Sequence, residues 1–137
     1  MQIDERSLKT CADSLARCNE STGLLDRFYE IFLASSPKVR EKFAQTDFVR
    51  QKSALRASLD AMLLAARDEK AGSAQYLGDL AERHSSRQLN IGSELYDLWL
   101  DSLLAAVKEC DPKSSPEVQE AWEKVMIVGI AYLLSRY

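Results

Sequence analysis

The sequence is poor in the residues that make turns, disulfides and multi-histidine metal sites. Its 137 residues include five glycines, three prolines, three cysteines and one histidine. Long stretches without glycine or proline favour helices over a turn-rich β architecture. Cys11, Cys18 and Cys110 are odd in number and lack a CxxC spacing. We therefore expect packed thiols in a reducing cytoplasm instead of disulfides.

Strong charge and long apolar runs are also missing. The formal net charge is −3 and the pI is near 5.2, so the chain lacks the excess of positive charge that is typical of nucleic-acid-binding proteins. No lysine and arginine cluster is dense enough to predict a membrane surface, and the first residues lack the apolar core of a secretory signal. The longest apolar run, Val125 to Leu134, is about half of the roughly 20 residues that cross a bilayer. We expect one soluble, cytoplasmic domain over residues 1–137.

Apolar residues recur at helical spacing throughout the chain, between clear turn signals. The first three expected helices are one over about 4–19, one that contains Leu25, Phe28, Tyr29 and Phe32, and a short one from Pro37 to Phe43. The fourth begins at Thr46 or Asp47 and ends between Arg67 and Gly72, and the fifth contains Leu77, Leu80, Ala81 and His84. The last two run from Glu94 to Cys110 and from Glu117 to about Arg136. Ser21 or Thr22 is expected to cap the second helix. No segment has a convincing strand pattern, so the predicted fold class is all-α.

Eight residues in these segments follow one another in the order and at the spacing typical of a known family. In chain order these residues are Tyr29, Pro37, Phe43, Gln51, Leu55, Leu80, His84 and Trp122. Pro37 and Phe43 follow Tyr29 by eight and fourteen residues, and the stretch from Phe28 to Phe43 is similar to bacterial haemoglobins. Over essentially its whole length the chain resembles a globin.

The resemblance implies a globin fold, a three-over-three helical sandwich around haem b. The haem is expected between the helix of Gln51 and the helix of His84. The short stretch from Phe43 to Gln51 implies that the extra helix that animal globins often fit there is absent, as is common in bacterial members.

His84 is the expected proximal ligand of the haem iron, through a neutral imidazole. Leu80 lies one turn earlier and Ala81 beside it, so the ring is expected on an apolar stripe. A packed or surface histidine is the alternative. If His84 is not the ligand, no other histidine can be.

The resemblance assigns further residues to the pocket. Phe43 would pack against the haem plane, and Leu55 would either limit the space over the iron or serve only as helix packing. Leu80, Ile91 and Tyr96 are further expected haem contacts. Tyr29 and Gln51 are the expected gas-ligand pair, because two hydrogen-bond donors can stabilise the partial negative charge of O2. Their alternatives are a tyrosine bonded to solvent or backbone and a surface glutamine.

The flavohaemoglobin branch carries a tyrosine and a glutamate beside its proximal histidine. Tyr96 lies about two residues from the tyrosine position, and Tyr137 falls approximately where the glutamate would be. The resemblance therefore does not imply that pair here. Candidate partners for the haem propionates are Arg50, Lys52, Arg83 and Arg87, each of which could instead belong to a solvated surface.

The expected function is reversible binding of O2, with CO and NO as further candidate ligands, by a monomer or homodimer. No glycine-rich dinucleotide loop occurs, so NO dioxygenation is an alternative only with a separate reductase, and enzymatic activity is not the first expectation. Two rivals contain no haem: a globin-like signalling or interaction module, and an unrelated helical bundle.

Overall fold

The structure is a computed structural model that describes residues 3–20, 23–68 and 72–137. Within these ranges, helices are the regular elements, joined by turns and irregular segments. Those ranges contain seven helices and no strand. The helices are α1 (Glu5–Glu20), α2 (Leu24–Ser35), α3 (Pro37–Lys42), α4 (Phe48–Arg67), α5 (Gly72–His84), α6 (Ser93–Cys110) and α7 (Pro116–Ser135). The all-α prediction is confirmed. The connection from α3 to α4 contains no helix, as expected for a chain without the extra helix that animal globins often have there. No helix in the described ranges is both long and apolar enough to cross a membrane.

Side-chain caps explain where several helices begin. The Asp47 carboxylate accepts a hydrogen bond from the Val49 backbone N–H at 3.0 Å at the start of α4. Ser36 and Ser115 cap α3 and α7 in the same way, each followed by a proline in the first turn. The start of α2 differs from the prediction: Gly23 is the N-cap, with no side-chain hydrogen bond and a φ of 139° that suits glycine. Ser21 and Thr22 lie outside the described residues.

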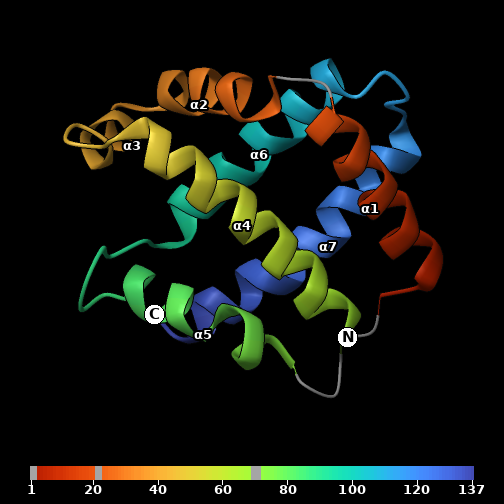
Figure 1. Cartoon of the computed structure of the whole chain (residues 1–137). Coiled ribbons are helices and arrows are strands. Elements are labelled where there is room, and N and C mark those ends of the chain that lie inside the picture. Colours follow the sequence, from red (N-terminus) through yellow and green to blue (C-terminus); the bar gives the residue numbers. More distant parts are fainter. Residues whose placement is uncertain (1–2, 21–22, 69–71) are drawn as a thin grey trace.

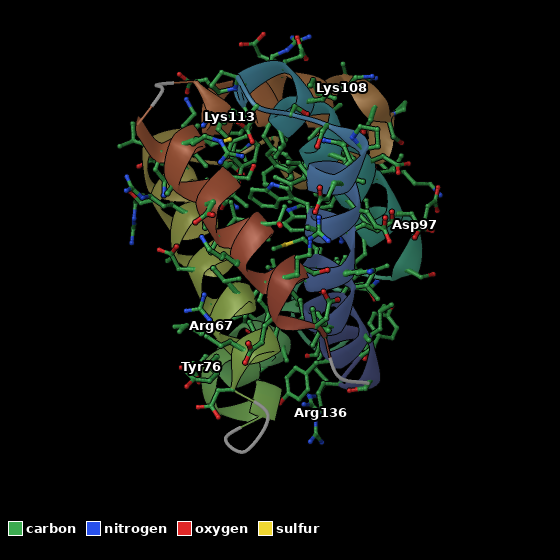
Figure 2. The ribbon with its side chains drawn as sticks, turned by 90° about the vertical axis from the view of Figure 1, so that its right-hand side faces the viewer. Arg67, Tyr76, Asp97, Lys108, Lys113 and Arg136 are labelled. Carbon is green, nitrogen blue, oxygen red and sulfur yellow. The ribbon has the colours of Figure 1, made fainter. Side chains whose placement is uncertain are left out.

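The helices form two layers, as the sequence resemblance implied. Figure 1 shows α4 crossing in front of α6 and α7, with α2 along one edge and α5 beside the C-terminal end of the chain. The layer of α1, α4 and α5 packs on the layer of α2, α6 and α7, chiefly through the pairs α1–α7, α4–α7 and α5–α7. In the rotated view of Figure 2, the labelled polar side chains Arg67, Asp97, Lys108, Lys113 and Arg136 lie at the periphery of the molecule.

The two layers meet in a tightly packed core. Phe28, Leu103 and Trp122 have no exposed surface. Where α4 crosses α7, Met62 rests on Gly129, and a Cβ added at that glycine would lie 2.7 Å from the methionine Cε. Gly129 therefore permits the close approach of these two helices.

A buried polar network joins α1 to the α6–α7 connection. Trp122 Nε1 donates to Ser14 Oγ at 2.8 Å, and Ser14 Oγ donates to Asp111 Oδ2 at 2.6 Å. Arg17 completes it with two hydrogen bonds to the Asp111 carboxylate, at 2.7 and 2.8 Å. These bonds satisfy polar atoms that would otherwise be buried without partners.

Candidate functional site

A largely apolar cavity of about 260 Å³ lies between α4 and α5, with walls contributed by six of the helices. All eight residues that the sequence analysis placed at the site line this cavity. They are Tyr29, Phe43, Gln51, Leu55, Leu80, His84, Ile91 and Tyr96. The structure therefore brings the whole predicted set together.

His84 is the last residue of α5 and is held by a tyrosine from α6. Its Nδ1 lies 2.9 Å from the hydroxyl oxygen of Tyr96. Burial, with a smaller contribution from the neighbouring Arg83 charge, lowers the pKa of His84 to about 4. The imidazole is therefore neutral near pH 7. With Nδ1 engaged by Tyr96, Nε2 is the nitrogen left to bind a ligand.

Tyr29 is fixed by an aromatic cluster on α2 and the neighbouring segments. Its ring makes edge-to-face contacts with Phe28, Phe43 and Phe48, at centroid distances of 4.9, 5.8 and 5.4 Å. Burial raises the pKa of its hydroxyl to about 12, although the neighbouring Gln51 side chain acts in the opposite direction. Tyr29 is thus a neutral phenol that keeps its proton and has a fixed direction.

The remaining predicted residues form apolar walls. Leu55 is buried, one turn along α4 from Gln51, while Phe43, Leu80 and Ile91 are partly buried against the core. Tyr96 is 5% exposed, and burial raises its pKa above the ordinary tyrosine value. It too is protonated and can take part in a hydrogen bond as a neutral hydroxyl.

The structure gives different partners to Tyr96 and Tyr137, the two tyrosines that were compared with the flavohaemoglobin pair. Tyr96 reaches the histidine although the sequence comparison placed it about two residues away from the flavohaemoglobin position. No carboxylate is among the residues lining the described cavity, and the Tyr137 hydroxyl is bonded instead to the side chain of Asn90.

Of the four basic residues considered for a carboxylate-bearing ligand, only Arg83 lines the cavity. Lys52 is ion-paired with Asp26 at 2.5 Å, and Arg87 with Glu82 at 2.8 Å. Arg50 does not line the cavity.

Sequence reasoning missed several residues of the site, among them Lys42, Leu89 and Phe48. Lys42 and Leu89 line the cavity, and Phe48 supports the Tyr29 ring. Lys42 precedes Phe43 directly, so its proximity could have been inferred. Leu89 could not be inferred from a helical period, because it lies in the irregular segment after α5; Ile91 in the same segment was predicted only from the resemblance.

The donor set fits a macrocyclic metal cofactor better than a bare ion. Within the described ranges no group of three or more histidine, cysteine, aspartate or glutamate side chains is placed to hold a metal. One neutral imidazole beside an apolar cavity matches a metal that brings its other ligands with it, as the iron of haem does.

Comparisons with known proteins agree with this geometry. The profile of the family described as Globin matches residues 26–132. A crystal structure of PA3967 from Pseudomonas aeruginosa PAO1, described as structurally highly homologous to a human hemoglobin, is 45% identical, with a TM-score of 0.90. The match covers 96% of this chain and 98% of that one. No curated protein matches the sequence significantly. By its sequence and its fold, the chain belongs to the globin family.

Proposed function

We propose that this globin binds haem b through His84 and reversibly binds O2 on the side of Tyr29 and Gln51. The observation that carries the proposal is one cavity lined by a single neutral imidazole, a buried tyrosine and a half-buried glutamine. CO and NO are further ligands of the same proposed site, and the cytoplasm is its proposed location.

The proximal role of His84 follows from the state of its ring. A neutral imidazole offers the Nε2 lone pair without first losing a proton. When Nε2 is the ligating atom, Nδ1 carries the hydrogen and donates it to the Tyr96 oxygen, 2.9 Å away. Tyr96 thereby fixes both the tautomer and the orientation of the ring, while the phenyl group of Phe43 offers an apolar surface to a flat cofactor.

Haem supplies, when bound, an iron with one open coordination position for a diatomic gas. The chain supplies selectivity through its donors. The Tyr29 hydroxyl keeps its proton, and the aromatic rings around it limit its motion. The Gln51 amide can accept from that hydroxyl or donate to a ligand. Both groups favour O2 over less polar CO, and Leu55 keeps their surroundings apolar.

An absorbance spectrum of the purified chain in ferric, ferrous and CO-bound forms tests the proposal. We expect haem to copurify and to give a Soret band at roughly 400–420 nm. The ferrous form is expected to be five-coordinate before gas is added, because the chain has no second histidine. A chain that neither retains nor takes up haem would favour the haem-free interaction module instead.

The His84→Ala variant tests the proximal assignment. It is expected to lose most of its haem during desalting and to keep it when imidazole is supplied. Gln88→Ala, a change at an exposed residue after α5, is the control and should retain haem. Full retention with an unchanged spectrum in His84→Ala would remove His84 from the ligand role.

A further inference from the structure

One wall of the cavity follows a regular stripe along α4. Four residues of this helix line the cavity at steps of four, three and four, which places them on one helical face. They are Gln51, Leu55, Ser58 and Met62. At a rise of about 1.5 Å per residue, the last of them lies roughly 16 Å along the helix axis from the first. Met62 therefore forms the end of the stripe that is farthest from Gln51.

The position of the Met62 side chain depends on a glycine of α7. A Cβ built on Gly129 would lie 2.7 Å from the methionine Cε and 2.9 Å from its Cγ. Both distances are too short for carbon atoms in a packed protein, so Met62 occupies space that any side chain at position 129 would need. Because position 129 is a glycine, Met62 can rest against the α7 backbone instead of projecting further into the cavity.

Met62 and Leu133 form the side of the cavity where α4 meets α7, which we call its floor. Leu133 lies one turn after Gly129 on α7, and it lines the cavity as Met62 does. The nearest polar group of the α4 stripe, the Ser58 hydroxyl, already donates to the Ala54 carbonyl at 2.9 Å. A charged group at this floor would lose its hydration without gaining a partner. An amphipathic ligand therefore meets the floor with its apolar edge.

We propose that Met62, seated on Gly129, sets the depth of the cavity and thereby limits the size of the apolar edge of the ligand that it accepts. The inference rests on the proposed function, since haem is a flat ligand with such an edge. A larger residue at position 129 would push Met62 off α7. Met62 is 2% exposed, so its side chain cannot turn to solvent, and the cavity is open volume that it borders. The displaced thioether would take space that a substituent on the ligand needs.

Two metal-free porphyrins measure this depth without involving His84 as a metal ligand. Protoporphyrin IX and deuteroporphyrin IX carry the same two carboxylates, but the second has hydrogens where the first has its two vinyl groups. In fluorescence titrations of the haem-free chain, Gly129→Ala should raise the Kd for protoporphyrin IX about five- to tenfold, because it overpacks the floor. The Kd for deuteroporphyrin IX should rise less than about twofold, because that ligand has no vinyl group to reach the displaced Met62.

Gly78→Ala is the matched control, because an added Cβ on this glycine of α5 meets nothing within 4 Å beyond its own helix in the described ranges. It should change neither Kd. Adding Met62→Ala to Gly129→Ala should return the ratio of the two Kd values to that of the unaltered chain, since the displaced side chain is gone. Equal weakening of both porphyrins by Gly129→Ala, no effect on either, or no return of the ratio would overturn the depth assignment while leaving the proposed haem site standing.

Met62→Ala alone tests the floor from the opposite direction and does not depend on the folding of Gly129→Ala. Removing the thioether should deepen the cavity, so the variant should accept a longer apolar edge. A deuteroporphyrin IX with propyl groups in place of the two hydrogens should bind Met62→Ala about five- to tenfold more tightly than the unaltered chain. An unchanged Kd for this propyl derivative would show that Met62 does not limit the depth. Failure of the unaltered chain to bind any of the three porphyrins would overturn the proposed function as well.

Discussion

At the scale of single residues, the proposed ligand side of the cavity is formed by Tyr29 and Gln51, which line it together. Tyr29→Phe and Gln51→Leu should each speed O2 dissociation about five- to tenfold, since each removes a net hydrogen bond of ~1–1.5 kcal/mol. CO dissociation should change far less, because CO is less polar. Stopped-flow ligand replacement measures both rates. The double variant should be less than additive, because the two side chains interact.

Ser58→Ala is the control for these variants. Ser58 also lines the cavity, but its hydroxyl already donates to the Ala54 carbonyl at 2.9 Å within α4. Its loss should leave O2 dissociation within a factor of about two. If Tyr29→Phe and Gln51→Leu behave like Ser58→Ala, neither residue faces the bound gas.

In the proposed haem site Tyr96 is a positioning residue, since it would act through His84. Tyr96→Phe keeps the ring but removes the oxygen that lies 2.9 Å from Nδ1. The imidazole then loses a hydrogen-bond acceptor and becomes a weaker electron donor to iron. We expect haem to be retained and the iron–histidine stretching frequency in resonance Raman spectra to fall. Tyr76→Phe, which removes a hydroxyl bonded to Asp68 outside the cavity, should leave the frequency unchanged.

At the scale of whole elements, Asp111 holds the connection between α6 and α7 against α1 through its hydrogen bonds with Ser14 and Arg17. Hydrogen bonds from Arg17, then from Ser14 and the Lys113 backbone, lower the pKa of this buried carboxyl to about 2. The pKa of this carboxyl is lower in the folded chain than in the unfolded chain, where it is near 4. Its ionised form therefore stabilises the folded chain at pH values above 4, and this stabilisation is lost as the pH falls toward 2. Asp111→Asn should reduce the free energy of unfolding at pH 7 by about 2 kcal/mol.

Urea titrations between pH 2 and pH 7 measure this effect. The unaltered chain should lose stability from about pH 4 to pH 2 more steeply than Asp111→Asn. Asp13→Asn, which breaks the exposed Lys9–Asp13 pair on α1, should cost no more than about 0.5 kcal/mol. Parallel pH profiles for Asp111→Asn and the unaltered chain would show that another carboxylate governs acid unfolding.

Helices were more predictable from the sequence than the contacts that tie them together. The period of apolar residues placed α4 and α6 within a few residues of their observed ends, because that period is a local property. Ser14 and Asp111 are 97 residues apart, and no pattern in the sequence around either residue predicts their hydrogen bond. Helical register likewise placed Leu80 on the face of His84, whereas the position of Leu89 depends on the path of an irregular segment.

The cavity belongs to the whole molecule, since its walls include side chains from six helices. Tyr29, Val39, Gln51, Leu80, Trp99 and Leu133 represent α2 to α7 in order. Only α1 contributes no described lining residue; it packs against α7 from outside. A ligand that fills the cavity thus contacts elements from both layers at once, and its binding is linked to the folding of nearly the entire chain.

This linkage predicts a large effect of haem on thermal stability. A ligand that binds only the folded state adds about 2.7 kcal/mol at a free concentration one hundred times its Kd. For a chain of this length that corresponds to an increase in Tm of about 10 °C. Circular dichroism should show the haem-free chain melting at a lower temperature, and amide hydrogen exchange should show its helicity lost first around His84. His84→Ala with excess haem should melt near the haem-free value. Coincident melting curves of the unaltered chain with and without haem would contradict a cofactor at the centre of this fold.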